Sequence, residues 1–76
     1  MVQAYVTIQT GGGTSQNVVE ELRELGKVRK ANIVAGEVDV IAEVEAESEQ
    51  DLLRLISDEI QSIDGVGRTR TCIILG

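Results

Sequence analysis

The sequence predicts an α+β fold in which two strand-helix-strand units are joined by a hairpin. Three observations indicate it: some segments alternate apolar and polar residues, two others space apolar residues three or four apart, and glycines mark the boundaries. The segment order is strand, helix, strand, strand, helix, strand. With right-handed crossovers, this order gives a four-stranded antiparallel sheet with two helices on one face, the ferredoxin-like βαββαβ arrangement.

The first strand is predicted at residues 2–8, where apolar and polar side chains alternate. The glycines at 11–13 end this strand, and Thr14 or Ser15 then offers a side-chain oxygen to the free amides of a helix start. The apolar stripe of this first helix comprises Val18, Leu22 and Leu25. We expect Gly26 to end the helix.

Residues 27–35 and 37–46 are predicted to form a central hairpin that turns at Gly36 and Glu37. The second of these strands alternates strictly, so one of its faces should meet the core. That face comprises Val38, Val40, Ala42, Val44 and Ala46. The opposite face comprises Glu37, Asp39, Ile41, Glu43 and Glu45.

The second helix has the clearer start, because Ser48 precedes acidic residues that favour a helix N-terminus. Its apolar stripe comprises Leu52, Ile56, Ile60 and Ile63, widened by Leu53 and Leu55. Asp64 and Gly65 end the helix, and residues 66–75 supply the last strand. The side chains directed from this strand towards the helices are either Thr69, Thr71, Ile73 and Leu75 or Arg68, Arg70, Cys72 and Ile74. We favour the first set, because buried arginines would need charged partners.

Length and charge limit the possible functions. Residues 1–76 form one domain, and a domain of this size buries only roughly 60% of its unfolded surface, so a partner subunit should add stability. The formal charge of -6 argues against direct binding to nucleic acid. No apolar run approaches the roughly 18 residues of a membrane span, and Met1 leads into a strand pattern instead of a signal peptide. We therefore expect a soluble, cytoplasmic protein without membrane contact.

The residues needed for most catalytic and metal sites are missing. The chain has no His and one Cys, which excludes Cys/His zinc sites, thiol redox pairs and Ser-His or Cys-His nucleophiles. We expect no enzyme activity, no metal and no cofactor. Cys72 lies in an apolar run and is interpreted as a small hydrophobic residue.

With both helices on one side, the other face of the sheet should show Tyr5, Thr7 and Ile41, a surface too apolar in places to stay in water. We expect another subunit to cover it. A sheet-to-sheet homodimer is the simplest cover, because two-fold association is the commonest solution for small proteins.

Three motifs could bind a ligand. The triglycine loop could approach an anion but lacks the Lys-Ser or Lys-Thr of a phosphate loop, so it is interpreted as a flexible turn. The segment 36–39 is either a solvated hairpin tip, which its spacing alone favours, or a site where the tip and the Asp39 carboxylate hold an ammonium group. The segment 65–71 carries two threonines on one face that could bind a carboxylate. Alternatively, its arginines pair with Glu43 or Glu45 on a neighbouring strand.

Three segments, 4–10, 34–42 and 65–71, resemble in order and spacing the effector-binding (RAM) domain of the Lrp/AsnC feast/famine regulators. The resemblance covers nearly the whole chain. Full-length members of the family carry an N-terminal helix-turn-helix domain, whereas this sequence begins at the module and resembles the stand-alone form. Two positions depart from the family: Gly12-Gly13 replaces a frequent Pro-Gly, and Val38 stands where many members have an aromatic residue.

The resemblance implies a subunit that dimerises through its sheet, with dimers assembling into rings, commonly octamers. It also implies an effector, typically an amino acid, bound in the cleft between dimers. The residues at the matching positions are Gly36, Glu37, Asp39, Thr69 and Thr71. Full-length regulators of the family are a further implied partner, through mixed assemblies.

Other functions use related subunits. An amino-acid-binding regulatory module of the ACT type shares the topology, but the motifs at 36–39 and 68–71 fit the feast/famine family better. A purely structural oligomer without ligand is a second alternative. An enzyme of the dimeric α+β barrel type would lack groups for acid-base work, because the chain has no His and one aromatic residue.

Overall fold

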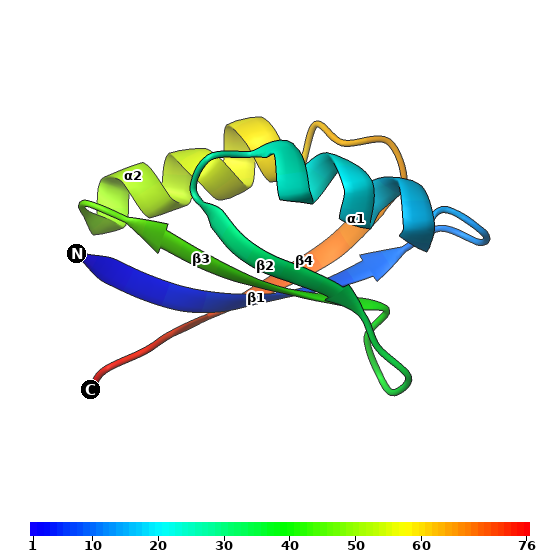
Figure 1. Cartoon of the computed structure of the whole chain (residues 1–76), viewed down its shortest axis with the longest axis horizontal. Coiled ribbons are helices and arrows are strands. Elements are labelled where there is room, and N and C mark those ends of the chain that lie inside the picture. Colours follow the sequence, from blue (N-terminus) through cyan, green and yellow to red (C-terminus); the bar gives the residue numbers. More distant parts are fainter.

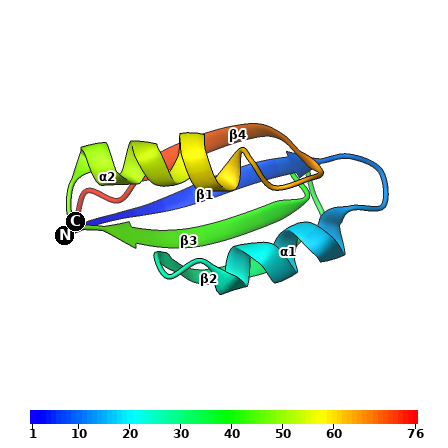
Figure 2. The ribbon, with the colours of Figure 1, turned by 90° about the horizontal axis from the view of Figure 1, so that it is seen from above.

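The computed structural model describes residues 1–76 and confirms the predicted fold. The elements are β1 (Val2–Thr10), α1 (Ser15–Glu24), β2 (Val28–Ile33), β3 (Val40–Ala46), α2 (Glu49–Arg54), the π-helical segment η1 (Leu55–Ile60) and β4 (Val66–Ile73). The strands form one antiparallel sheet in the order β2-β3-β1-β4. Both helices cover the same face of this sheet (Figures 1 and 2).

The core lies between the helices and the sheet, and every buried residue in it is apolar. The two central strands contribute alternate residues, as predicted. Those from β1 are Ala4, Val6 and Ile8, and those from β3 are Val40, Ala42, Val44 and Ala46. Helix α1 adds Val18, Val19 and Leu22, whereas Leu25 is only partly buried.

The predicted side-chain cap of α1 is wrong. Thr14 occupies the position before the helix, but its hydroxyl donates to the Gly11 carbonyl at 2.8 Å instead of accepting a helix amide. The Ser15 hydroxyl lies 2.7 Å from that of Thr10. The side chains at this helix start therefore hold the glycine loop and the end of β1.

The second helical segment begins as predicted, because the Ser48 hydroxyl accepts the Asp51 amide at 3.1 Å. From Leu55 onward the helix widens, and the Gln61 amide bonds to the Ile56 carbonyl five residues back at 2.9 Å. The wider turn lets both Leu55 and Ile60 face the core. The predicted stripe is therefore partly wrong: Ile56 is only partly buried, and Leu53 is 62% exposed.

The tight turn predicted at Gly36 and Glu37 is also wrong. Strand β2 ends at Ile33 and β3 begins at Val40, so residues 34–39 form a longer loop. Figure 1 shows this loop turning away from the helices, on the open side of the sheet.

The register of β4 settles which of its side chains face the helices. Thr69 lies opposite Ile8 and Thr71 opposite Val6, and directly opposed residues share a face of a sheet. The favoured orientation is confirmed for Thr69, Thr71 and Ile73, whereas Leu75 lies beyond the strand and is 96% exposed.

The predicted pairing of the β4 arginines with Glu43 or Glu45 is wrong. Strand β1 lies between β4 and β3, so these side chains are not on neighbouring strands. Glu45 instead pairs with Arg29 of β2 at 3.4 Å.

Candidate functional site

The loop 34–39 carries three of the residues predicted to bind a ligand. Gly36 and Glu37 are exposed, and Asp39 is partly buried where the loop meets the sheet. Asp39 makes hydrogen bonds through its amide, its carbonyl and its carboxylate. Its amide donates to the Ile8 carbonyl at 3.1 Å, its carbonyl accepts the Val34 amide at 2.9 Å, and its Oδ2 accepts the Thr10 amide at 2.8 Å.

The loop after β1 and the loop before β4 meet at the same end of the sheet. The Gly11 amide donates to the Gly65 carbonyl at 2.9 Å. Gly65 has a φ of +99°, and a Cβ at this position would lie 2.5 Å from Oγ1 of Thr14. A side chain at position 65 would therefore be strained and would also collide with the glycine loop.

The other two predicted site residues, Thr69 and Thr71, lie on β4 and face the helix side of the sheet. Thr69 is partly buried and accepts a hydrogen bond from Nε2 of Gln61 at 3.0 Å, whereas Thr71 is exposed. The loop 34–39 projects from the opposite side (Figure 1). A single subunit therefore does not gather the five predicted residues into one cavity.

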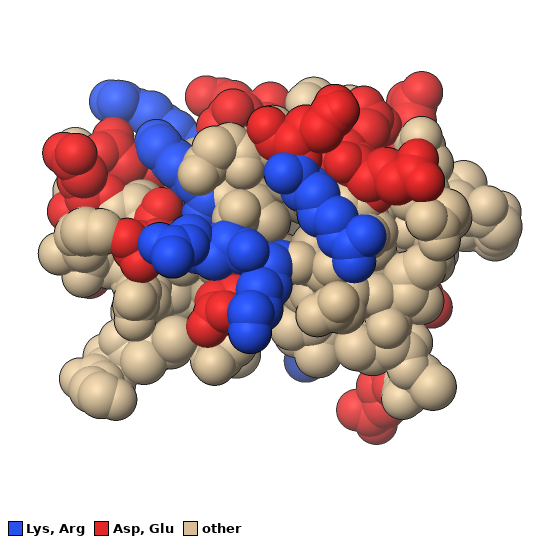
Figure 3. Space-filling view, viewed as in Figure 1, with Lys and Arg blue, Asp and Glu red and all other residues tan.

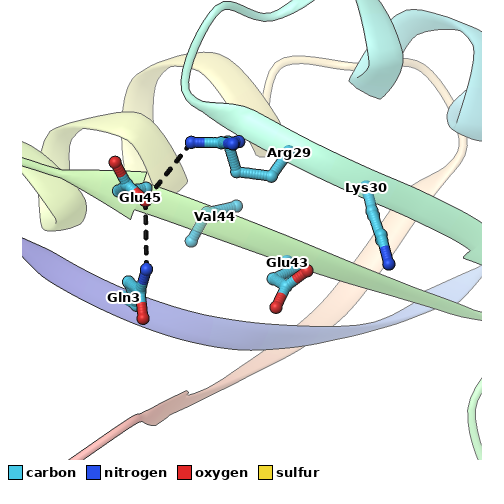
Figure 4. A pocket seen from close by; sticks show the side chains of 6 residues that line it. All are labelled: Gln3, Arg29, Lys30, Glu43, Val44 and Glu45. Atoms are coloured by element: carbon cyan, nitrogen blue, oxygen red, sulfur yellow. Dashed lines mark hydrogen bonds and ion pairs between the residues drawn. The ribbon is translucent and has the colours of Figure 1, made fainter.

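Three hollows lie along β2 instead, and none of them contains a predicted site residue. The first, of about 180 Å³, is shown in Figure 4; its lining residues are Gln3, Arg29, Lys30, Glu43, Val44 and Glu45. In it, Oε1 of Glu45 accepts from Nε2 of Gln3 at 3.1 Å and from Nη1 of Arg29 at 3.4 Å. Lys30 lies opposite Glu43 across the two strands. The second hollow, of about 320 Å³, adds Tyr5, Asn32, Val34 and Ile41 on the same side of the sheet.

The sequence contains a signal for this polar group in the charges of residues 29–30 and 43–45. Basic residues on β2 stand near acidic residues on β3, an arrangement that hairpin pairing would bring together. An irregularity between Val28 and Lys30 shifts the register by one residue. Because of this shift and the misplaced turn, the individual pairs could not be assigned from the sequence.

The uncovered face of the sheet has the predicted mixed character. Tyr5 is 45% exposed, and Thr7 and Ile41 are partly buried on this side. Cys72 lies opposite Tyr5 and is exposed, so the one thiol is outside the core of the subunit. The protein therefore presents an aromatic ring, aliphatic side chains and a thiol beside polar and charged groups on this face.

Basic side chains gather near the outer strand β2 (Figure 3). Arg29 and Lys30 belong to this strand, Lys27 directly precedes it, and Arg23 lines a hollow together with Arg29 and Lys30. The Arg23 guanidinium reaches from α1 to this edge of the sheet. Its Nε and Nη2 donate to the Ala31 carbonyl at 3.0 and 2.8 Å. One carbonyl of an edge strand, which another chain could otherwise use for pairing, is therefore occupied.

The structure contains no group of three or more Asp, Glu, His or Cys side chains arranged to hold a metal ion. None of its helices has the length and hydrophobicity needed to cross a membrane.

Comparison with known proteins gives a consistent result. A model of the Lrp/AsnC ligand-binding domain family matches residues 3–76. An uncharacterized HTH-type transcriptional regulator of Pyrococcus abyssi is 32% identical over 62 residues, which are 82% of this chain and 41% of the relative. The chain thus spans less than half the length of that regulator.

Two solved structures are similar over most or all of their length. A hypothetical protein from Pyrococcus horikoshii is 32% identical with a TM-score of 0.93, covering 99% of this chain and 90% of the other. The structure of FFRP-DM1 is 32% identical with a TM-score of 0.94, covering 99% of this chain and all of the other.

Proposed function

The chain belongs to the family of Lrp/AsnC ligand-binding domains, and on this basis we propose that it is an oligomeric sensor of a small molecule, an amino acid, in transcription regulation. The observation that carries the proposal is the family match over residues 3–76. The regulators that resemble the chain support a cytoplasmic role in regulation, without catalysis.

Assembly is the first part of the proposal. A homodimer forms through the uncovered sheet face, where Tyr5 and Ile41 offer apolar area beside charged neighbours. Dimers then associate into a closed ring such as an octamer. The placement of the predicted residues supports a site made by more than one subunit, because the loop 34–39 and Thr69 with Thr71 lie on opposite sides of one sheet.

The ligand is the second part. An amino acid needs acceptors for its ammonium group and donors for its carboxylate. In the proposed site, acceptors come from the loop 34–39, which includes Gly36, Glu37 and Asp39, and the hydroxyls of Thr69 and Thr71 on another subunit provide the donors. A transcriptional regulator of Neisseria meningitidis with the same fold, 16% identical and with a TM-score of 0.89, was solved as a complex with L-Met.

The third part is the partner. The resemblance to HTH-type regulators supports mixed assemblies in which this chain joins full-length family members and alters their binding to DNA. Co-expression of the tagged chain with such a regulator tests this step. We expect the two proteins to elute together, and separate elution at all ratios would leave a sensor that acts without them.

Light scattering coupled to size exclusion, with each of the twenty amino acids in turn, tests the ligand and the assembly together. A ligand that binds only the folded or assembled state must stabilise that state by mass action. We expect a few amino acids to raise the melting temperature by several degrees or to change the mass, with their D-enantiomers as controls.

A purely structural oligomer is the second candidate, because the hollows of one subunit contain none of the predicted residues. An assembly that responds to none of the amino acids would favour it. A monomer at all concentrations would contradict the proposed assembly.

A further inference from the structure

Asp39 is the residue that joins the loop 34–39 to the sheet. The regular pairing of β1 with β3 ends at Ile8 and Val40. Beyond this pair the Asp39 amide still donates to the Ile8 carbonyl at 3.1 Å, and the next contact to β1 is made by the side chain: Oδ2 of Asp39 accepts the Thr10 amide at 2.8 Å. The carboxylate takes the place of a backbone carbonyl and extends the pairing past the end of β3. Without it, a partly buried amide would lack an acceptor.

Thr10 connects this contact to the rest of the same sheet end. Its hydroxyl lies 2.7 Å from the hydroxyl of Ser15, the first residue of α1. Thr10 itself lies opposite Val66, the first residue of β4. A displacement of the Asp39 carboxylate would therefore also displace the start of α1 and the start of β4, the strand that carries Thr69.

The two carboxylates of the loop differ in what they can offer a ligand. One oxygen of Asp39 already accepts a backbone amide, and the side chain is partly buried. Glu37 is exposed and makes no side-chain hydrogen bond. A carboxylate that is free to move can meet an incoming ammonium group without giving up an existing bond.

We propose that Asp39 acts at the effector site as a positioning residue, holding the loop 34–39 against Thr10, while Glu37 is the carboxylate that contacts the ligand's ammonium group. This inference rests on the proposed function. It divides the roles of two acidic residues that the sequence alone places together in one motif.

Two substitutions at Asp39 distinguish its role in holding the loop from the effect of its negative charge. Asp39→Asn keeps an oxygen that can accept the Thr10 amide but removes the negative charge, whereas Asp39→Ala removes both. Glu37→Gln is the matched control, because it neutralises the other carboxylate of the same loop. Asp39→Ala will perturb the loop, so every variant is first compared with the wild type in assembly mass and melting temperature.

The first readout needs no ligand. Hydrogen exchange at the Thr10 amide, followed by NMR, should be faster by roughly tenfold or more in Asp39→Ala and close to wild type in Asp39→Asn and Glu37→Gln. Unchanged protection of Thr10 in Asp39→Ala would overturn the positioning role, whether or not an amino acid binds.

The second readout is the affinity for the amino acid that gives the largest thermal shift with the wild type. We expect Asp39→Asn to remain within a few-fold of wild type, and Asp39→Ala and Glu37→Gln each to lose roughly tenfold or more. Equal losses in both Asp39 variants, with Thr10 still protected in Asp39→Asn, would make Asp39 the direct counter-ion and overturn the inference. If the wild type binds none of the twenty, the proposed function fails, and the exchange at Thr10 decides alone whether Asp39 holds the loop.

Discussion

The face of the sheet beneath the helices and the face opposite it are built from the same four strands, yet their chemistry differs. The helix-covered face buries apolar side chains alone. The open face places Tyr5 and Ile41 beside Lys30 and Glu43, and its outer part holds the Arg29–Glu45 pair. The first face therefore supplies the free energy of folding. The second has too little buried area to do so in one subunit and is suited to contact between subunits.

The largest expected effect comes from a substitution in the core between the helices and the sheet. Leu52 is buried and Leu53, next to it in α2, is 62% exposed. Leu52→Ala should lower the free energy of unfolding by about 2–5 kcal/mol, because it leaves a cavity in a close-packed core. Leu53→Ala, the same chemical change on the outer surface, should cost far less. Urea denaturation of both variants gives the comparison, and equal losses would contradict the observed burial.

A second substitution adds an atom to the covered side instead of removing one. Gly65→Ala must accept a φ of +99° and a Cβ 2.5 Å from Oγ1 of Thr14. We expect it to destabilise the fold by roughly 1–3 kcal/mol in thermal unfolding. Gly36→Ala is the control, since a Cβ at that position meets no atom within 4 Å. A Gly65→Ala variant with the stability of the wild type would contradict this expectation and would show that Thr14 can move to admit the added Cβ.

The open face is tested through assembly. Tyr5→Glu should weaken the association of subunits by about 2 kcal/mol or more, because it places a charge in the proposed interface; this loss raises the dissociation constant roughly 30-fold. Sedimentation over a range of concentrations measures this shift, with Glu20→Gln on the outer face of α1 as the control. Far-UV circular dichroism of Tyr5→Glu should match the wild type, because the ring is outside the core. Unchanged association would place the interface elsewhere.

The smallest expected effect comes from the ion pair on the open face. The Arg29 side chain is 62% exposed, so Arg29→Ala should change the free energy of unfolding by only about 0–1 kcal/mol. Arg54→Ala, which removes an ion pair on the helix side, is the comparison. A larger loss in Arg29→Ala that disappears at high salt and in dilute protein would assign the arginine to the contact between subunits.

The sequence was sufficient for the features that depend on local periodicity. Alternation predicts the inner faces of β1 and β3, and Ser48 followed by acidic residues predicts the start of the second helix. Periodicity failed where the backbone leaves the ideal repeat. The stripe of the second helix was read at an α-helical spacing, but the π-helical turn brings Leu55 and Ile60 to the core together.

The candidate site could be located only as a set of positions. The family motifs pointed to the loop 34–39 and to Thr69 and Thr71, but their relative placement depends on the order of strands in the sheet. The bond from the Thr10 amide to Asp39 joins residues 29 positions apart, and no local pattern reports it. The polar hollow beside Arg29 and Lys30 depends on a register shift, which residue types alone do not reveal.

The guanidinium of Arg23 has a consequence for how this small sheet can grow. A strand adding beside β2 would have to displace two hydrogen bonds from the Ala31 carbonyl and approach a basic surface. A further strand can therefore add only beside β4, the other outer strand of the sheet. When each subunit offers one such edge, pairing of edges joins two subunits and then stops. One arginine thus makes endless fibre growth costly, while closed assemblies of the same protein stay accessible.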